Sequence, residues 1–506
     1  MILILDFGSQ FTHLIYQKIQ RSGYECLVLP ADTTIRETSQ LKIDGIILSG
    51  SAKSVENDEI KFDWGWINMD TPVLGICYGH QLIAKKFGAT LSKQNSEFGY
   101  SEVKVNKSNE LFVNLPEKMQ VWQSHNDSVI SMPVDFHAVA SSKYDKFSSL
   151  QHNSLPIYTV QFHPEVSHTT LGDQILLNFC KNICKIESAG KWSATHFISN
   201  FKNKVARDID KKTILCALSG GLDSFTMTAL LAKYLPKNQM KILYVDTGLM
   251  PDETMKECQE FCKIIGHDLV VIDASDRFFE KLKKVKKPAQ KGKVIGELFI
   301  RIFEEYAQNN DITIFAQGTI WSDVVESGIT KFSSQIKPHH NVGGLPKKIN
   351  ISIYEPLRKL FKDQVRQVAK GLKLPIWIVQ RKVFPGPGYA IRVQGEVTRD
   401  KVKLVRKSNA ILNEILANEK YANKIWMAFT ILVEVPSLGV KGDEHVDNQF
   451  AIVVRIVEST NSMTANFSRR VMNILPKVSS RIVNETEIGR VIYDITDKPP
   501  ATIEWQ

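Results

Sequence analysis

The chain has 506 residues, of which 43% are hydrophobic and 23% charged, and these values exclude a disordered protein and favour several globular domains. It contains no uninterrupted apolar stretch of bilayer-spanning length, and its start, MILILDFGSQF, has no basic leader, so we expect a cytoplasmic protein without membrane association. The formal net charge of +10 comes mostly from scattered lysines, and nucleic-acid binding is not expected. The one dense basic run, KLKKVKKPAQKGK at 281–293, lacks aromatic residues and predicts a solvated face or a mobile loop.

The seven cysteines are odd in number and spread along the chain, which predicts reduced thiols and no disulfide framework. Cys180 and Cys184 are four residues apart, as are Cys258 and Cys262, so each pair lies on one helix face. No nearby histidine pair completes a zinc tetrad. We interpret these four cysteines as core residues.

Short apolar runs alternate with amphipathic stretches, a pattern typical of parallel sheets flanked by helices, and predict an α/β protein. In chain order, strands are expected at LILDF, GIILSG and PVLGIC, then at TILCAL after a pause near 189. A helix is expected within 353–375, closed by Gly371 and Pro375, before the turn-rich FPGPG at 384–388. WMAFTILVEV and FAIVVRIVE are strand candidates in a small α+β unit at the end. The predicted domains are 1–188, 189–381 and 382–506.

Cys77 lies at a predicted strand-to-helix turn in TPVLGICYGHQLIAKKFG, between Gly75 and Gly79. A nucleophile on such a turn projects outward, and the helix N-terminus favours its thiolate. A cysteine nucleophile also needs an oriented base, which can lie far away in sequence. VQFHPEVSH supplies His163, and Glu165 is placed to hold the imidazole in one tautomer. Cys77, His163 and Glu165 are therefore the candidate catalytic residues.

The elbow from Gly75 to Gln81 and the HPE motif from His163 to Glu165 resemble the class I glutamine amidotransferases, over about the first 188 residues. The resemblance implies a flavodoxin-like domain, a γ-glutamyl thioester on Cys77, release of ammonia, and hydrolysis to glutamate. It also implies that Gln81 and Asp127, the latter in WQSHNDSV, contact glutamine.

The oxyanion loop is where the sequence departs from this family, because GIILSGSAKSV replaces the usual SGGP with Ser51 and Ala52. The resemblance places one oxyanion donor in the loop at Gly50 and Ser51 and the other at the N–H of Tyr78. Since the donor is a backbone N–H, a serine can still supply it. Glutaminase activity is expected, and closure of the synthetase domain is a candidate requirement for it.

A second loop, in ILCALSGGLDSFTMTALLAKYL, is again a strand, a glycine turn and a helix. Backbone N–H groups at a helix N-terminus can wrap a phosphate, and the hydroxyls add donors. The loop is not a Walker A motif, which argues against γ-phosphate transfer. It resembles the PP-loop of the Rossmann-like ATP pyrophosphatases, which cleave ATP between its α and β phosphates. The residues that this assigns to ATP are Ser219, Gly220, Gly221, Leu222, Asp223 and Ser224.

Two aspartates are further candidates around the nucleotide. The resemblance gives Asp223 a role in holding Mg²⁺, which offsets the charge of pyrophosphate. Asp246 ends the next strand, in YVDTGL, at the carboxyl edge where such sheets bind nucleotides. It is a candidate ATP contact, and a helix-capping role is the alternative.

An amidotransferase followed by a PP-loop domain resembles the GMP synthase family, and the similarity continues through HHNVGGLPKK, FPGPGYAIRVQGEVT and the terminal DKPPATIEWQ. It implies the substrates glutamine, ATP and xanthosine monophosphate (XMP), adenylation of the oxygen on carbon 2, and displacement of AMP by ammonia. It also implies a homodimer through the C-terminal domain. The residues assigned to XMP on this resemblance are Lys498, Ile503 and Glu504, with Lys337, His339 and His340 on a loop over the reacting centre.

Several positions depart from that family's pattern. Lys382 and Val383 stand where His-Pro is common, Met250 and Pro251 follow GL where an Arg is common, and Gln506 replaces a terminal Glu. KGDEHVDNQF also lacks the usual Arg and Tyr after GD. Two alternatives therefore stay open: a paralogue that aminates another oxo group, and a basic nucleic-acid-binding protein on a retired enzyme scaffold. Asparagine synthetase is not expected, because it requires an N-terminal cysteine and here Met1 precedes Ile2, and thiouridine-forming enzymes have no use for the Cys77 set.

Overall fold

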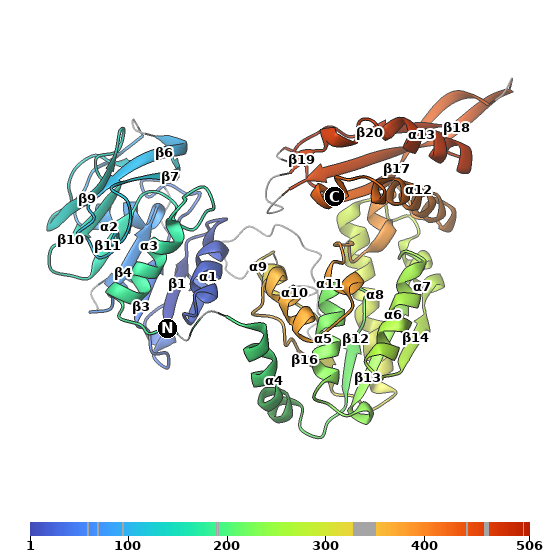
Figure 1. Cartoon of the computed structure of the whole chain (residues 1–506), viewed down its shortest axis with the longest axis horizontal. Coiled ribbons are helices and arrows are strands. Elements are labelled where there is room, and N and C mark those ends of the chain that lie inside the picture. The colour runs from blue at the N-terminus through green and yellow to red at the C-terminus, as the bar shows by residue number, and fades with distance from the viewer. Residues whose placement is uncertain are drawn as a thin grey trace. The chain divides into compact units, whose positions relative to one another are not determined.

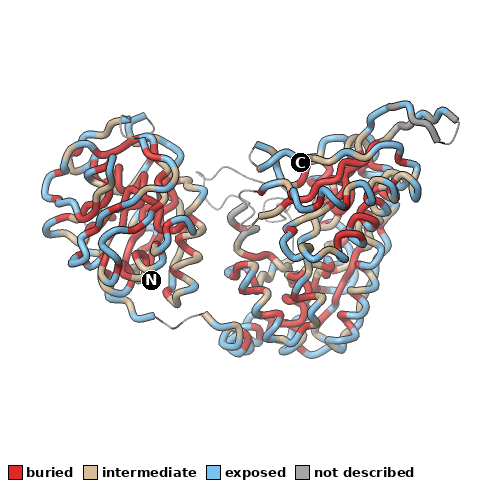
Figure 2. The backbone as a smooth tube through the Cα atoms, turned by 45° about the horizontal axis from the view of Figure 1, so that its top comes forward, coloured by how far each residue is buried: buried red, intermediate tan, exposed pale blue. Residues whose placement is uncertain are grey.

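A computed structural model describes residues 1–57, 60–67, 70–93, 96–188, 190, 192–326, 351–441, 444–459, 465–498 and 500–505. Their contacts form two compact units, one ending at His196 and the other starting at Phe197. In both, the buried residues concentrate on the central strands (Figure 2). No helix in the described part of the chain is long and apolar enough to cross a membrane.

The first unit is built on a nine-stranded mixed sheet in the order β2-β1-β3-β4-β11-β10-β9-β6-β7 (Figure 1). The strands up to β11 are parallel and those from β10 to β7 are antiparallel. Their bounds are β1 (Ile2–Asp6), β2 (Cys26–Pro30), β3 (Gly45–Leu48), β4 (Val73–Ile76), β6 (Glu97–Val105), β7 (Lys118–His125), β9 (Phe136–Ser142), β10 (Ser149–His152) and β11 (Ile157–Val160). Every residue of β1, β3, β4 and β11 is buried, as expected for apolar runs inside a parallel sheet.

Helices cover the parallel half of this sheet. α1 (Thr12–Arg21) packs against α3 (Gly172–Asn178), and α2 (Tyr78–Lys86) packs against β4 and β11. The strands predicted at LILDF, GIILSG and PVLGIC are confirmed as β1, β3 and β4. The carboxyl ends of β3, β4 and β11 therefore meet at one edge, where the chain continues into Gly50, Cys77 and His163.

The second unit contains a five-stranded parallel sheet in the order β14-β13-β12-β15-β16. Its strands are β12 (Ile214–Ala217), β13 (Met240–Asp246), β14 (Leu269–Asp273), β15 (Ile314–Ala316) and β16 (Ser352–Tyr354). The chain builds outward from β12 through β13 to β14, and then returns to the other side of β12. The order of strands therefore reverses between β12 and β15. In such sheets ligands bind at this switch point, outside the carboxyl ends of the strands.

The last part of the chain is a four-stranded sheet whose main feature is the hairpin of β17 (Met427–Lys441) and β18 (Glu444–Glu458). The strands β19 (Asn466–Phe467) and β20 (Arg490–Tyr493) pair with β18. α12 (Arg399–Ala417) packs on β17, and α13 (Leu475–Glu485) packs on α12 and β20. The predicted α/β class with a small α+β unit at the end is thus confirmed.

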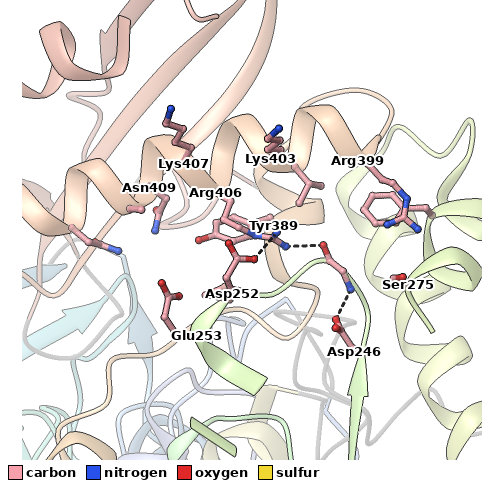
Figure 3. Close-up of a pocket in the computed structure, with 16 residues that line it drawn as sticks. Asp246, Asp252, Glu253, Ser275, Tyr389, Arg399, Lys403, Arg406, Lys407 and Asn409 are labelled. Atoms are coloured by element: carbon pink, nitrogen blue, oxygen red, sulfur yellow. Dashed lines mark hydrogen bonds and ion pairs between the residues drawn. The ribbon is translucent and has the colours of Figure 1, made fainter. Parts of the chain in front are cut away.

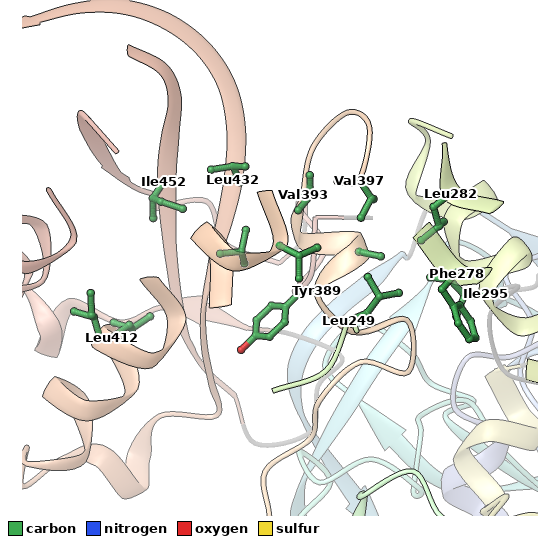
Figure 4. Packing of buried hydrophobic residues seen from close by; sticks show 14 of the residues in the cluster. Leu249, Phe278, Leu282, Ile295, Tyr389, Val393, Val397, Leu412, Leu432 and Ile452 are labelled. Atoms are coloured by element: carbon green, nitrogen blue, oxygen red, sulfur yellow. The ribbon is translucent and has the colours of Figure 1, made fainter. Parts of the chain in front are cut away.

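One hydrophobic core runs through the second unit and joins its two sheets. It extends from Leu249 and Phe278 past Tyr389 to Leu412 and Ile452 (Figure 4). The boundary predicted near 382 lies inside this unit, so the division into three domains stays a prediction. The helix predicted within 353–375 starts later than its pattern suggested, because 352–354 forms β16 and α10 spans Lys362–Gly371.

The basic run at 281–293 contains one residue that corrects its prediction. Most of its lysines are exposed, but Pro288 begins α8 (Pro288–Gln308), and Lys291 on its first turns is fully buried. The Lys291 ammonium donates to the carbonyl oxygens of Ala390 (3.1 Å) and Val393 (2.6 Å). Lys291 therefore belongs to the core although the other lysines of the run are exposed. Its ammonium supplies the hydrogen-bond donor for two buried backbone carbonyls.

Replacing Lys291 by methionine is expected to lower the free energy of unfolding of this unit by about 1–3 kcal/mol, because two buried carbonyls lose their donor. Burial lowers the pKa of Lys291 from 10.5 to about 8. Between those values the unfolded chain still holds a proton that the folded chain has released, so this group makes the wild type more stable as pH rises through that window. Urea unfolding at neutral and alkaline pH should show that the free energy of unfolding of the wild type exceeds that of Lys291→Met by an amount that grows with pH. The variant Lys293→Met, at an exposed lysine, should unfold like the wild type at each pH.

Candidate active sites

Cys77 lies on a strained turn between β4 and α2. Its φ of 52° and ψ of −100° are unusual for a residue with a side chain, and its N–H donates to Val160 O at 2.8 Å. The flanking glycines make the turn fit: a Cβ on Gly75 would lie 2.7 Å from the Gly79 carbonyl, and one on Gly79 would lie 2.7 Å from Leu48. The turn therefore has the elbow geometry that presents a nucleophile at a strand end.

His163 follows β11 and is held on both sides. Its Nδ1 lies 2.6 Å from Glu165 Oε1, its backbone N–H donates to Trp122 O, and a Cβ on Gly50 would lie within 4 Å of both the His163 ring and the Cys77 Cβ. Burial alone lowers the pKa of His163, but Glu165 and Cys77 raise it, and the net pKa lies well above the ordinary value. Because Glu165 occupies Nδ1, Nε2 is left for the sulfur. The three predicted catalytic residues are therefore adjacent.

The predicted oxyanion residues flank this pair. A Cβ on Gly50 would lie 3.1 Å from His163 Cε1 and 3.6 Å from Cys77 Cβ, so the Gly50 backbone borders both groups. Tyr78 follows Cys77 directly at the start of α2. The Ser51 hydroxyl accepts a hydrogen bond from the Lys53 N–H at 3.1 Å. The Ser51 side chain is therefore held within its own turn. The oxyanion role of these residues stays a prediction.

Gln81 and Asp127, the predicted glutamine contacts, are joined to each other. The Gln81 side-chain amide donates to Asp127 O (2.6 Å) and to Gln161 Oε1 (3.2 Å). The Asp127 carboxylate accepts the Ser54 hydroxyl at 2.6 Å. Both residues are buried beside the elbow, and their direct contact with glutamine stays a prediction. Thr169, which no sequence motif indicated, supports His163 from behind: its hydroxyl donates to His163 O at 2.6 Å and accepts the Trp122 N–H.

The second predicted loop lies between β12 and α5 (Leu222–Ala232). Gly220 has a φ of 78°, and a Cβ there would lie 2.5 Å from Thr254 Cγ2. The Ser224 hydroxyl accepts the Ser219 N–H (3.2 Å) and donates to Gly221 O (3.0 Å), which closes the turn. The loop residues assigned to ATP, Ser219, Gly220, Gly221, Leu222, Asp223 and Ser224, thus gather at the first turn of α5.

Two residues from distant segments complete this loop, and neither was predicted from the sequence. Lys362, at the start of α10, donates to Asp223 Oδ2 at 2.7 Å. Gly318 follows β15, and a Cβ on it would lie 3.1 Å from Ser224 N. These contacts place the loop at the switch point between β12 and β15. Lys362 could not be found from its local pattern, because 139 residues separate it from Asp223.

Asp246 lies at the end of β13 and faces a different opening (Figure 3). This cleft of about 930 Å³ lies between the carboxyl edge of the sheet and α12, and its lining includes none of the residues 219–224. Asp246 accepts the Gly248 N–H at 2.9 Å. Arg406 of α12 spans the cleft to Asp252 (2.8 Å) and Gly248 O (2.9 Å). Contact of Asp246 with ATP stays a prediction.

The predicted XMP residues of the C-terminal tail are fixed in three ways. Lys498 forms a backbone bridge with Ala465, Ile503 packs against the cluster around Phe429, and Glu504 is paired with buried Arg392. Their binding of XMP stays a prediction. The other three predicted XMP residues, Lys337, His339 and His340, lie outside the described residues.

Comparison with known proteins identifies all three regions of the chain. Residues 3–183 match the model for "Glutamine amidotransferase class-I", 193–379 the model for "PP-loop domain", and 414–505 the model for "GMP synthase C terminal domain". Proteins named "GMP synthase (glutamine-hydrolyzing)" align with the entire chain. That of Campylobacter jejuni strain RM1221 is 42% identical over 100% of this chain and 99% of its own. Those of Staphylococcus saprophyticus and Thermotoga sp. strain RQ2 are each 41% identical over 100% of this chain, and over 98% and 100% of their own.

The two strand-end turns, one with a thiol beside an imidazole and the other with glycines and hydroxyls at a helix N-terminus, fit this similarity. The similarity is well above 30% identity and extends over the full length of both this chain and its relatives. We conclude that the chain belongs to the family of glutamine-hydrolysing GMP synthases.

Proposed function

We propose that this chain synthesises GMP from XMP, with ATP as the activating substrate and glutamine as the source of nitrogen. The observation that carries the proposal is the presence, in one chain, of the buried Cys77–His163–Glu165 set and of a turn rich in glycine and serine at the switch point of a second sheet. We assign glutamine hydrolysis to 1–188, ATP use to 189–381, and acceptor binding with homodimer formation to 382–506.

In the first half-reaction the Cys77 thiolate attacks the glutamine carboxamide carbon. The N–H groups of Ser51 and Tyr78 face the oxygen that becomes negative, and His163 gives its proton to the departing ammonia. Water, deprotonated by His163, then attacks the γ-glutamyl thioester and releases glutamate and the free thiol. Glu165 keeps Nε2 of His163 directed at the sulfur through both steps.

In the second half-reaction the loop from Ser219 to Ser224 holds the β and γ phosphates of ATP. The oxygen on carbon 2 of XMP attacks the α phosphorus, the bond to the β phosphate breaks, and pyrophosphate leaves. Ammonia then attacks carbon 2 of the adenylated intermediate and displaces AMP, which yields GMP. Lys362 adds a positive charge beside the loop where the anionic leaving group develops.

The loop also fits a Mg²⁺ ion. Asp223 Oδ2 is paired with Lys362, but its Oδ1 is buried without a hydrogen-bond partner among the described residues. Mg²⁺ in nucleotide sites is often held by one or two carboxylates together with the substrate phosphates and water. Asp223 Oδ1 is the oxygen that would hold it, and the ion would offset the charge of pyrophosphate. No cluster of three metal-binding side chains lies in the described part of the chain, so most ligands would come from the nucleotide and water.

The proposal is tested by incubating the protein with ATP and ammonium chloride and one acceptor at a time, and by quantifying GMP and AMP by chromatography. We expect equal amounts of GMP and AMP from XMP, and no aminated product from other oxopurine nucleotides. AMP formation with a different acceptor but not with XMP would identify a paralogue. Tight, strongly salt-dependent binding of DNA or RNA without any turnover would favour the retired-scaffold alternative.

Glu165→Gln is expected to reduce glutaminase activity by about 10²–10⁴-fold, because the neutral amide no longer holds His163 in the reactive tautomer. It should also move the alkaline limb of the pH profile to lower pH. The Glu165 carboxylate raises the pKa of His163, so its removal lets burial lower that pKa, and the imidazolium loses its proton earlier. Glutamate release measured between pH 6 and 10 checks both effects. An unshifted alkaline limb in the variant would assign that limb to another group.

A further inference from the structure

The segment 384–393 is locked to the ATP-binding sheet at several points. Gly388 has a φ of 64°, and a Cβ on it would lie 2.3 Å from Leu249 O. The next residue, Tyr389, donates its N–H to the same carbonyl at 2.8 Å. Lys291 binds the carbonyl oxygens of Ala390 and Val393 from α8. The backbone of Arg392, between these last two contacts, is therefore fixed relative to the carboxyl end of β13.

The Arg392 side chain leaves that segment and reaches the C-terminal tail. It is 2% exposed, and it donates to both carboxylate oxygens of Glu504, at 2.9 Å from Nη2 and 3.4 Å from Nε. Its guanidinium also lies over the rings of Phe429 (4.5 Å) and Phe384 (4.8 Å). A planar cation that is held by two hydrogen bonds and two aromatic faces has one orientation. The desolvation of a buried ion pair can offset its attraction, so the pair need not stabilise the fold. The fixed geometry of the pair is what it contributes here.

The tail does not need Arg392 to keep its backbone shape, because Arg455 on β18 holds it separately. Arg455 is fully buried and donates to the carbonyl oxygens of Thr496 (2.8 Å), Thr502 (2.9 Å) and Ile503 (2.9 Å). It also forms an ion pair with Asp494 at 2.8 Å. The contact of Arg392 with the tail is directed instead at the side chain of Glu504.

We propose that Arg392 is a positioning residue that sets the Glu504 carboxylate in register with the ATP site. The inference rests on the proposed function, in which Glu504 contacts XMP. The xanthine ring carries N–H groups that can donate hydrogen bonds to a carboxylate. The oxygen on carbon 2 of the same ring must lie in line with the α phosphorus of ATP. A displacement of about 1 Å between two reacting groups can cost about 100-fold in rate. The contacts from Leu249 through Tyr389 and Arg392 connect Glu504 to the segment after β13, which belongs to the same sheet as the loop at 219–224.

The test uses the full-length enzyme with ammonium, so that glutamine hydrolysis does not enter. Arg392→Lys keeps the charge but not the two-pronged hydrogen bond, and Glu504→Gln keeps the shape but not the charge. Each is expected to lower kcat/KM for XMP by about 100-fold and to leave the KM for ATP unchanged. The double variant should be no worse than the worse single one, because both residues act through one contact. Arg481→Lys, which alters an exposed ion pair with Glu485 on α13, is the control with an unchanged kcat/KM.

Different outcomes separate this inference from the proposed function. A wild-type enzyme that leaves XMP unchanged contradicts the function itself. Wild-type turnover with an unaltered kcat/KM in Arg392→Lys overturns the positioning role, whether or not Glu504→Gln is impaired. A KM for ATP that rises together with the loss for XMP, or additive losses in the double variant, also overturn it, because they indicate general disruption or two independent contacts. Thermal unfolding of each variant identifies any loss that comes from misfolding.

Discussion

Cys77→Ala is expected to abolish GMP synthesis from glutamine, by about 10⁴-fold or more, and to leave synthesis from ammonium chloride at the wild-type rate. The thiol is the proposed nucleophile of the first site, and alanine removes it from a turn that otherwise keeps its glycines and its hydrogen bond to Val160. The loop at the second site is built from other segments and does not need the sulfur. The rate of GMP formation with each nitrogen donor is the measurement.

The control is Cys26→Ala, because Cys26 is a partly exposed thiol of the same unit that lies outside the elbow. We expect it to behave as wild type with both donors. If Cys77→Ala still uses glutamine, the nucleophile is elsewhere. If it loses both activities while remaining folded, the division into two independent sites is wrong.

Gly220→Ala, unlike Cys77→Ala, should lose GMP and AMP formation with either nitrogen donor, by about 100-fold or more, since backbone N–H groups that hold the phosphates would be displaced. Its φ of 78° disfavours any residue with a Cβ, and that Cβ would lie 2.5 Å from Thr254, which is buried and β-branched and has little freedom to move. The loop must shift to accommodate it. AMP release with ammonium as donor measures the loss, and Cys77 labelling by a glutamine analogue shows that the first unit is intact.

Gly266→Ala provides a matched control for backbone strain. Gly266 also has a positive φ, 70°, but a Cβ there would meet nothing within 4 Å. Alanine is expected to destabilise the second unit by about 1–2 kcal/mol and to leave turnover unchanged. Equal losses of activity in the two variants would mean that strain, and not the position of the phosphate loop, accounts for the effect.

The local elements at both sites could be predicted from the sequence because each depends on short-range chemistry. The apolar runs before Cys77 and before Ser219 indicated buried strands, and the glycines that follow indicated tight turns before helices. The α10 start was predicted too early because 352–354, which is compatible with either state, is paired with β15. Pairing with a distant strand is a tertiary effect that a local pattern does not contain.

The α/β class, the two turns and the type of residue that each turn carries could be read from the amino-acid sequence, because strand burial, glycine conformation and helix starts are set within a few residues. The contacts between distant residues emerged from the folded structure alone. Lys362 pairs with Asp223, Arg392 pairs with Glu504, and Lys291 is buried although the other lysines of the basic run are exposed. Long charged side chains reach several ångströms from their own segment. Their partners are set by how sheets and helices pack, so no periodicity along the chain encodes them.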